Sequence, residues 1–240
     1  MLNWIERKIR AGIRWILTKL GKQSMPSYFE QLKAELPAIA KLSNTGGPNG
    51  YFAQEAMRFH SIAGTLLESG LALDETSTVD ERYFTHTLTR ALLEPFFVIL
   101  YLFDDPSQTT ARHEELTNSF KDQYRKLMND LHEPEWQVFM QAHGSKLEAV
   151  NPTWTRTNQL PNVKDMLKRL QNNYHDTLDF LYPLYRITSF DTHGRSLGTL
   201  FESVFGKQCN FPVLKLKFAF EIMANQYLVV LNDLRKAGAA

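Results

Sequence analysis

Residues 91–103, ALLEPFFVILYLF, are the longest apolar run in the chain, and only Glu94 and Pro95 interrupt it. Its 13 residues are fewer than the roughly 20 that a membrane-spanning helix needs. We therefore expect this run to be buried inside a globular domain. The helical pattern extends back to about Val79, which predicts one long helix over residues 79–103. Pro95 lies inside it, where proline costs about 3 kcal/mol, so we expect a kink there.

The rest of the sequence predicts further helices and no strands. Leu occurs 32 times and Val only nine times, a ratio that favours helix over sheet. Ser27 followed by Glu30 is typical of a capping box at a helix start. Besides 79–103, helices are predicted at residues 27–42, 51–71, 107–131, 133–150, 162–172, 174–187, 196–205 and 212–236. Residues 189–194 are polar and are predicted to be irregular. The expected fold class is all-α, a multi-helix bundle of about six long helices.

One loop divides the chain. Residues 43–50, SNTGGPNG, form the clearest turn-forming segment. We interpret it as a linker between a basic amphipathic helical arm at residues 1–42 and an all-α domain at residues 51–236.

Composition limits the possible functions. Lys plus Arg is 27 and Asp plus Glu is 26, so the chain as a whole lacks the excess positive charge of a typical nucleic-acid-binding protein. The single cysteine, Cys209, excludes an intrachain disulfide and a cysteine-rich zinc site, and it suits the reducing cytoplasm. Phosphate-binding loops, dinucleotide fingerprints and zinc-protease spacings are absent from the sequence. We therefore expect no cofactor and no metal.

The N-terminal arm is strongly basic. Residues 1–23 contain six basic residues and one acidic residue, a net charge of +5. At 100° per residue, Ile and Leu fall on one face and the basic residues on the other. The arm could lie on an anionic membrane, contact nucleic-acid phosphates, or pack against the domain or a second copy. The candidate contact residues are Trp4, Arg7, Lys8, Arg14 and Trp15.

Two clusters could carry chemistry. Arg90 and Glu94 lie one helical turn apart at the start of the apolar run, and buried charges there need partners. They form either part of a site or an ion pair that only ties helices together.

The second cluster is residues 185–194, YRITSFDTHG. Arg186 could hold a phosphate and stabilise its developing charge, and His193 could transfer protons near neutral pH. Asp191 could orient that imidazole. The structural alternative pairs Arg186 with a carboxylate such as Glu94 and leaves the polar residues to satisfy a tight turn.

Together these residues resemble a known superfamily. Arg90-Ala91-Leu92-Leu93-Glu94, the apolar run ending at Tyr101-Leu102, and then Tyr185, Ser189 and His193-Gly194 resemble the all-helical HEPN superfamily (higher eukaryotes and prokaryotes nucleotide-binding) over about residues 51–236. Arg186 and His193 fit the upper limit of its Arg–His spacing, although Ile187 follows Arg186 where that family usually has a polar residue.

The resemblance implies a metal-independent endoribonuclease of the kind found in toxins and phage defence, working as a homodimer with a composite RNA cleft. His193 would then be the general acid/base and Arg186 would bind the scissile phosphate. Arg90, Glu94, Tyr185, Ser189 and Asp191 would support them. The alternative is a non-catalytic helical binding or regulatory domain, docked on a membrane surface or a partner protein by residues 1–20.

Overall fold

The computed structural model describes residues 27–194, 197–208 and 215–239. Within these residues it contains only helices and turns, so the predicted all-α multi-helix fold is confirmed. The α-helices are α2 (Tyr28–Leu42), α3 (Gly47–Glu68), α4 (Val79–Phe103), α5 (Thr109–Leu131), α6 (Gln137–His143), α7 (Val163–Lys168), α8 (His175–Thr192), α9 (Leu197–Phe205) and α10 (Leu216–Lys236). Two 3-10 turns, Pro134–Trp136 and Gly144–Lys146, flank α6.

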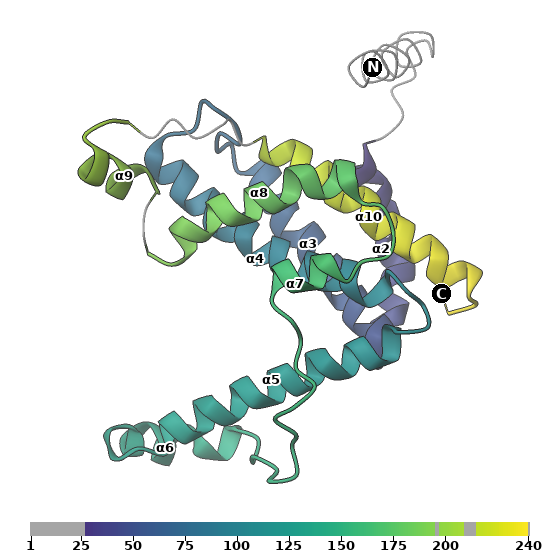
Figure 1. Cartoon of the computed structure of the whole chain (residues 1–240), viewed down its shortest axis with the longest axis vertical. Helices are drawn as coiled ribbons and strands as arrows, with labels where there is room; N and C mark the ends of the chain where they lie inside the picture. The colour runs from purple at the N-terminus through teal and green to yellow at the C-terminus, as the bar shows by residue number, and fades with distance from the viewer. Residues whose placement is uncertain (1–26, 195–196, 209–214, 240) are drawn as a thin grey trace.

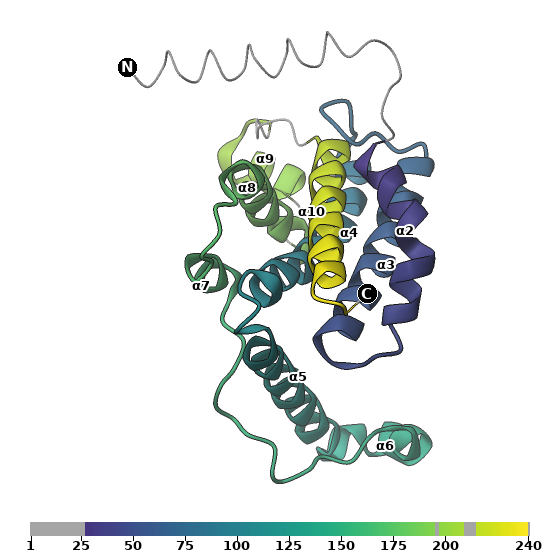
Figure 2. The same cartoon turned by 90° about the vertical axis from the view of Figure 1, so that its right-hand side faces the viewer.

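Helix α4 is the centre of the bundle. It packs against α3, α5, α7, α8, α9 and α10, and Figures 1 and 2 show it enclosed by its neighbours. The seven residues from Phe96 to Leu102 are all buried, and burying each large apolar side chain contributes about 1.5–3 kcal/mol. Thr78 and Glu81 begin the helix with a capping box. The helix continues through Pro95 without a break.

Helix α4 is also the one helix among the described residues whose length and composition would suffice to cross a membrane. Of its apolar window, 67% is buried inside the protein. The expectation that residues 91–103 lie in a core is therefore confirmed.

The domain begins earlier than the sequence analysis expected. In α2, Phe29, Leu32 and Ile39 are buried in the same core as α3 and α10. Arg235 of α10 also forms two hydrogen bonds with the Glu35 carboxylate. Residues 28–42 are thus part of the bundle rather than of a separate arm, and α3 already begins inside the predicted 43–50 linker. The candidate contact residues Trp4, Arg7, Lys8, Arg14 and Trp15 lie outside the described residues.

The end of α8 differs from the prediction in a way that matters for the site. Residues 189–192, predicted to be irregular, belong to the helix. The hydroxyls of Thr188, Ser189 and Thr192 donate to the carbonyls of Leu184, Tyr185 and Thr188, each four residues earlier. A helix can accommodate hydroxyl side chains in this way. The series of hydroxyl residues at 188–192 therefore does not end α8.

The region after α4 leaves the body of the molecule. Figure 1 shows α5 extending away from the bundle with α6 at its far end. The predicted helix over 133–150 is reduced to α6 and its two 3-10 turns. Several large apolar side chains on this limb are exposed, including Phe120 (68%) and Val138 (79%). We call residues 109–162 the α5–α6 limb.

Candidate functional site

Four of the predicted site residues meet between α4 and α8. Arg90 Nη1 donates to Glu94 Oε2 at 2.7 Å, and Arg90 Nε donates to Ser189 Oγ at 3.0 Å. The guanidinium lies over the Tyr185 ring, with Cζ 3.8 Å from the ring centroid. The contacts of Arg90 with Ser189 and Tyr185 require α4 and α8 to lie side by side. Sequence spacing therefore predicted only the contact between Arg90 and Glu94. We call these four residues the Arg90 cluster.

The Arg90 cluster lies at the boundary between core and solvent. The Arg90 side chain is only 10% exposed, whereas that of Glu94 is 57% exposed. Burial raises the pKa of Tyr185, while the Arg90 charge acts in the opposite direction. The edge-to-face contact of Tyr185 with Phe97, at 5.4 Å, joins the cluster to the core. A buried guanidinium with three partners fixes α8 against α4.

Asp191 does not orient His193. Its Oδ2 lies 2.6 Å from His86 Nδ1, and its Oδ1 accepts the Leu197 backbone N–H at 2.8 Å. His86 and Asp191 are both almost fully buried. The sequence analysis missed His86, although its position four residues before Arg90 places it on the same side of α4. The role predicted for Asp191 is therefore corrected: it links α4, α8 and the start of α9.

Arg186 and His193 are both exposed on one face of α8. They are seven residues apart, which is two helical turns and about 10 Å of rise. The side chains of these two residues form no hydrogen bond or ion pair with the described part of the chain. Arg186 therefore does not pair with Glu94, whose carboxylate is bound by Arg90. The backbone N–H of His193 donates to Ser189 O at 3.3 Å, closing the last turn.

Helices near this end of α8 carry exposed apolar side chains. In Figure 1, α9 lies beside the start of α4 and the end of α8. A Cβ added at Gly198 of α9 would lie 3.1 Å from Val79 Cγ1, so the two helices approach closely. The exposed large apolar side chains on these two helices are Val79, Tyr83 and Phe84 on α4, and Leu200, Val204 and Phe205 on α9. We call these six residues the α4–α9 patch.

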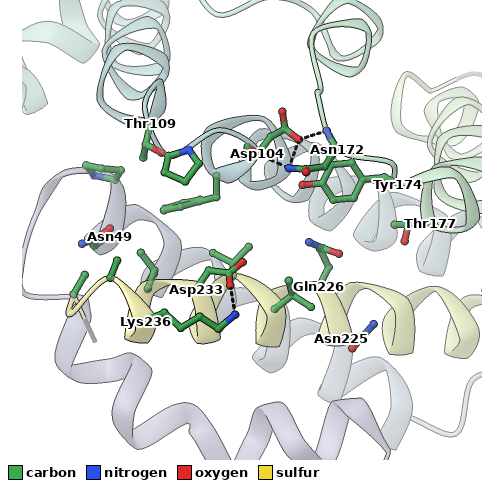
Figure 3. A pocket seen from close by; sticks show the side chains of 18 of the residues that line it. Asn49, Asp104, Thr109, Asn172, Tyr174, Thr177, Asn225, Gln226, Asp233 and Lys236 are labelled. Atoms are coloured by element: carbon green, nitrogen blue, oxygen red, sulfur yellow. Dashed lines mark hydrogen bonds and ion pairs between the residues drawn. The ribbon is translucent and has the colours of Figure 1, made fainter.

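A groove of about 1370 Å³ lies at the opposite end of α8. Figure 3 shows it between the start of α8, the α4–α5 corner and the C-terminal half of α10. Its charges are already paired: Asp104 accepts the backbone N–H groups of Gln171 and Asn172, and Lys236 binds Asp233 at 2.8 Å. None of the predicted site residues lines the groove, so it is separate from the Arg186–His193 face.

Among the described residues, no three His, Cys, Asp or Glu side chains are grouped as metal ligands would be. No protein-family model, curated protein or solved structure matches this chain.

Proposed function

We propose that this protein is a metal-independent endoribonuclease that acts as a homodimer through the exposed face of α8. The observation that carries the proposal is the placement of Arg186 and His193. Both are exposed, their spacing puts them on about the same side of one helix, and their side chains form no hydrogen bond or ion pair with the described residues. The resemblance to HEPN ribonucleases in the Arg–His spacing supports the same assignment.

The chemistry follows from the two side chains. Arg186 binds the non-bridging oxygens of the scissile phosphate and stabilises the negative charge that grows there. The imidazole of His193 removes the proton from the 2′-hydroxyl, whose oxygen then attacks phosphorus. The bond from phosphorus to the 5′-oxygen breaks, and that oxygen takes a proton. The products are a 2′,3′-cyclic phosphate and a free 5′-hydroxyl.

The mechanism favours two copies of the chain. One imidazole accepts the proton while a second donates one to the leaving oxygen, and each chain supplies one His193. The α4–α9 patch supports this arrangement, because large apolar side chains that are exposed near a site are candidates for burial in a protein interface. A two-fold axis through such a patch would bring the two copies of α8 close together.

The test is RNA cleavage by the pure protein in the presence of EDTA. His193→Ala should lower the cleavage rate by about 10²–10⁴-fold, the usual contribution of a general acid or base. His143→Ala, which removes an exposed histidine from α6, should cleave at the wild-type rate. Equal cleavage by wild type and His193→Ala, or none by either, would refute the proposal.

The alternative function is a non-catalytic binding or regulatory domain. One observation favours it: the α5–α6 limb exposes Phe120, Trp136 and Val138, side chains that a partner protein could cover. The contact that the sequence assigned to residues 1–20, with a membrane or a partner, lies outside the described residues. A folded wild-type protein that binds partners but leaves RNA intact would establish this alternative.

A further inference from the structure

Phe190 occupies an unusual place on α8. It lies four residues after Arg186 and three before His193, so its ring projects from the same region of the helix. Its exposed fraction is 45%. Phe180, Tyr182 and Tyr185 on the same helix all pack against the core, whereas Phe190 is not among the side chains that do. Among the described residues its ring also stacks on no other aromatic ring.

An exposed phenyl ring beside a phosphate-binding arginine suits a nucleobase. Along the helix Phe190 lies about 6 Å from Arg186 and about 4.5 Å from His193, distances comparable to the size of one nucleotide. Proteins that bind single-stranded nucleic acid commonly stack bases on aromatic side chains, and every base has a face that can do so.

We infer that Phe190 stacks on an unpaired base next to the phosphate held by Arg186. This inference rests on the proposed function and adds a residue that selects the substrate. A base inside an RNA duplex is already stacked on its neighbours, and only bases in loops, bulges and single strands can be turned onto a protein ring. Phe190 therefore selects unpaired over paired RNA.

The experiment measures binding separately from cleavage. The probe is a single-stranded 2′-deoxy oligonucleotide that contains 2-aminopurine and cannot be cleaved, since it lacks the attacking hydroxyl. Phe190→Leu keeps an apolar side chain without the ring, and Phe190→Trp keeps an aromatic face. Phe120→Leu is the matched control, because it removes an exposed phenyl ring (68% exposed) from the distant limb.

Phe190→Leu should weaken binding by about 5- to 150-fold, which corresponds to about 1–3 kcal/mol of stacking. It should also abolish the quenching of 2-aminopurine fluorescence. Phe190→Trp and Phe120→Leu should bind as the wild type does. The same strand in a perfect duplex should bind more weakly to the wild type, and Phe190→Leu should reduce that difference.

Three results would overturn the inference. The first is unchanged binding of the oligonucleotide by Phe190→Leu, and the second is equal binding of the single strand and the duplex by the wild type. The third is a wild-type protein that sediments as a dimer while Phe190→Leu sediments as a monomer. The last would make Phe190 a dimer contact instead of a base-stacking residue. The outcome is distinguishable from that of the proposed function. Binding that depends on Phe190 without RNA cleavage would refute only the ribonuclease, and cleavage that ignores Phe190 would refute only the stacking.

Discussion

Asp104→Ala is expected to lower the free energy of unfolding by about 3–5 kcal/mol, the usual cost of removing one partner from a buried charged network. The Asp104 side chain is fully buried. It accepts hydrogen bonds from the backbone N–H of Gln171 at 2.7 Å and of Asn172 at 3.0 Å. It also lies 3.8 Å from the buried Arg112 guanidinium. The substitution leaves the two backbone N–H groups without an acceptor and removes the negative charge beside Arg112, whose Nη1 still donates to the Tyr101 carbonyl. Urea unfolding followed by circular dichroism would measure the loss.

The matched control for this prediction is Asp130→Ala, which removes an exposed carboxylate near the end of α5. Surface substitutions of this kind usually change stability by no more than about 0.5 kcal/mol. If Asp104→Ala and Asp130→Ala unfolded at the same urea concentration, the hydrogen bonds of Asp104 would not stabilise the contact between the α4–α5 corner and the segment that leads into α8.

The second large effect is expected at Asp191. Asp191→Ala should also cost about 3–5 kcal/mol, because it leaves the buried His86 ring and the Leu197 N–H without their acceptor. Asp191→Asn should cost less, since the remaining carbonyl oxygen can still accept one of these hydrogen bonds. A double-mutant cycle with His86→Ala, measured by urea unfolding, would isolate the His86–Asp191 interaction.

Asp179→Ala provides the comparison for Asp191, because Asp179 is an exposed carboxylate on the same helix. Its unfolding curve should overlay that of the wild type. Asp191 would lose its assigned structural role if Asp191→Ala were as stable as Asp179→Ala. If Asp191→Ala were stable but failed to cleave RNA, that result would instead support the role predicted from the sequence, in which Asp191 supports Arg186 and His193.

The local features of the fold could be predicted from the sequence. The bounds of α4 follow from the start of the helical pattern at about Val79 and from the apolar run that ends at Phe103, and each signal lies at its own end of the helix. The Arg90–Glu94 ion pair follows in the same way, because residues four apart meet on any helix. Such features depend on spacing along one element and need no knowledge of the tertiary structure.

The features that depend on packing could not be predicted. His86 and Asp191 are 105 residues apart, and nothing in either segment marks the other as its partner. Residues 28–42 resembled an independent arm because their apolar stripe does not reveal what it packs against. The irregular segment predicted over 189–194 is confined to residues 193–194. Residues 189–192 stay helical because hydroxyl side chains can bond to carbonyls within the helix as well as end it. With 189–192 predicted to be irregular, the sequence did not place Arg186 and His193 along one helix.

The α5–α6 limb has a consequence for how this chain tolerates change. In the described structure, no residue between Leu102 and Val163 belongs to the main buried cluster, although Phe103, Leu116 and Leu160 pack against its edge. Insertions or deletions at the far end of the limb therefore leave the bundle's interior atoms in place, and they cost mainly the entropy of closing a longer or shorter connection, which grows slowly with length. The length of the limb can therefore change without disturbing the bundle. The same is not true of α4 and α8, which pack against each other.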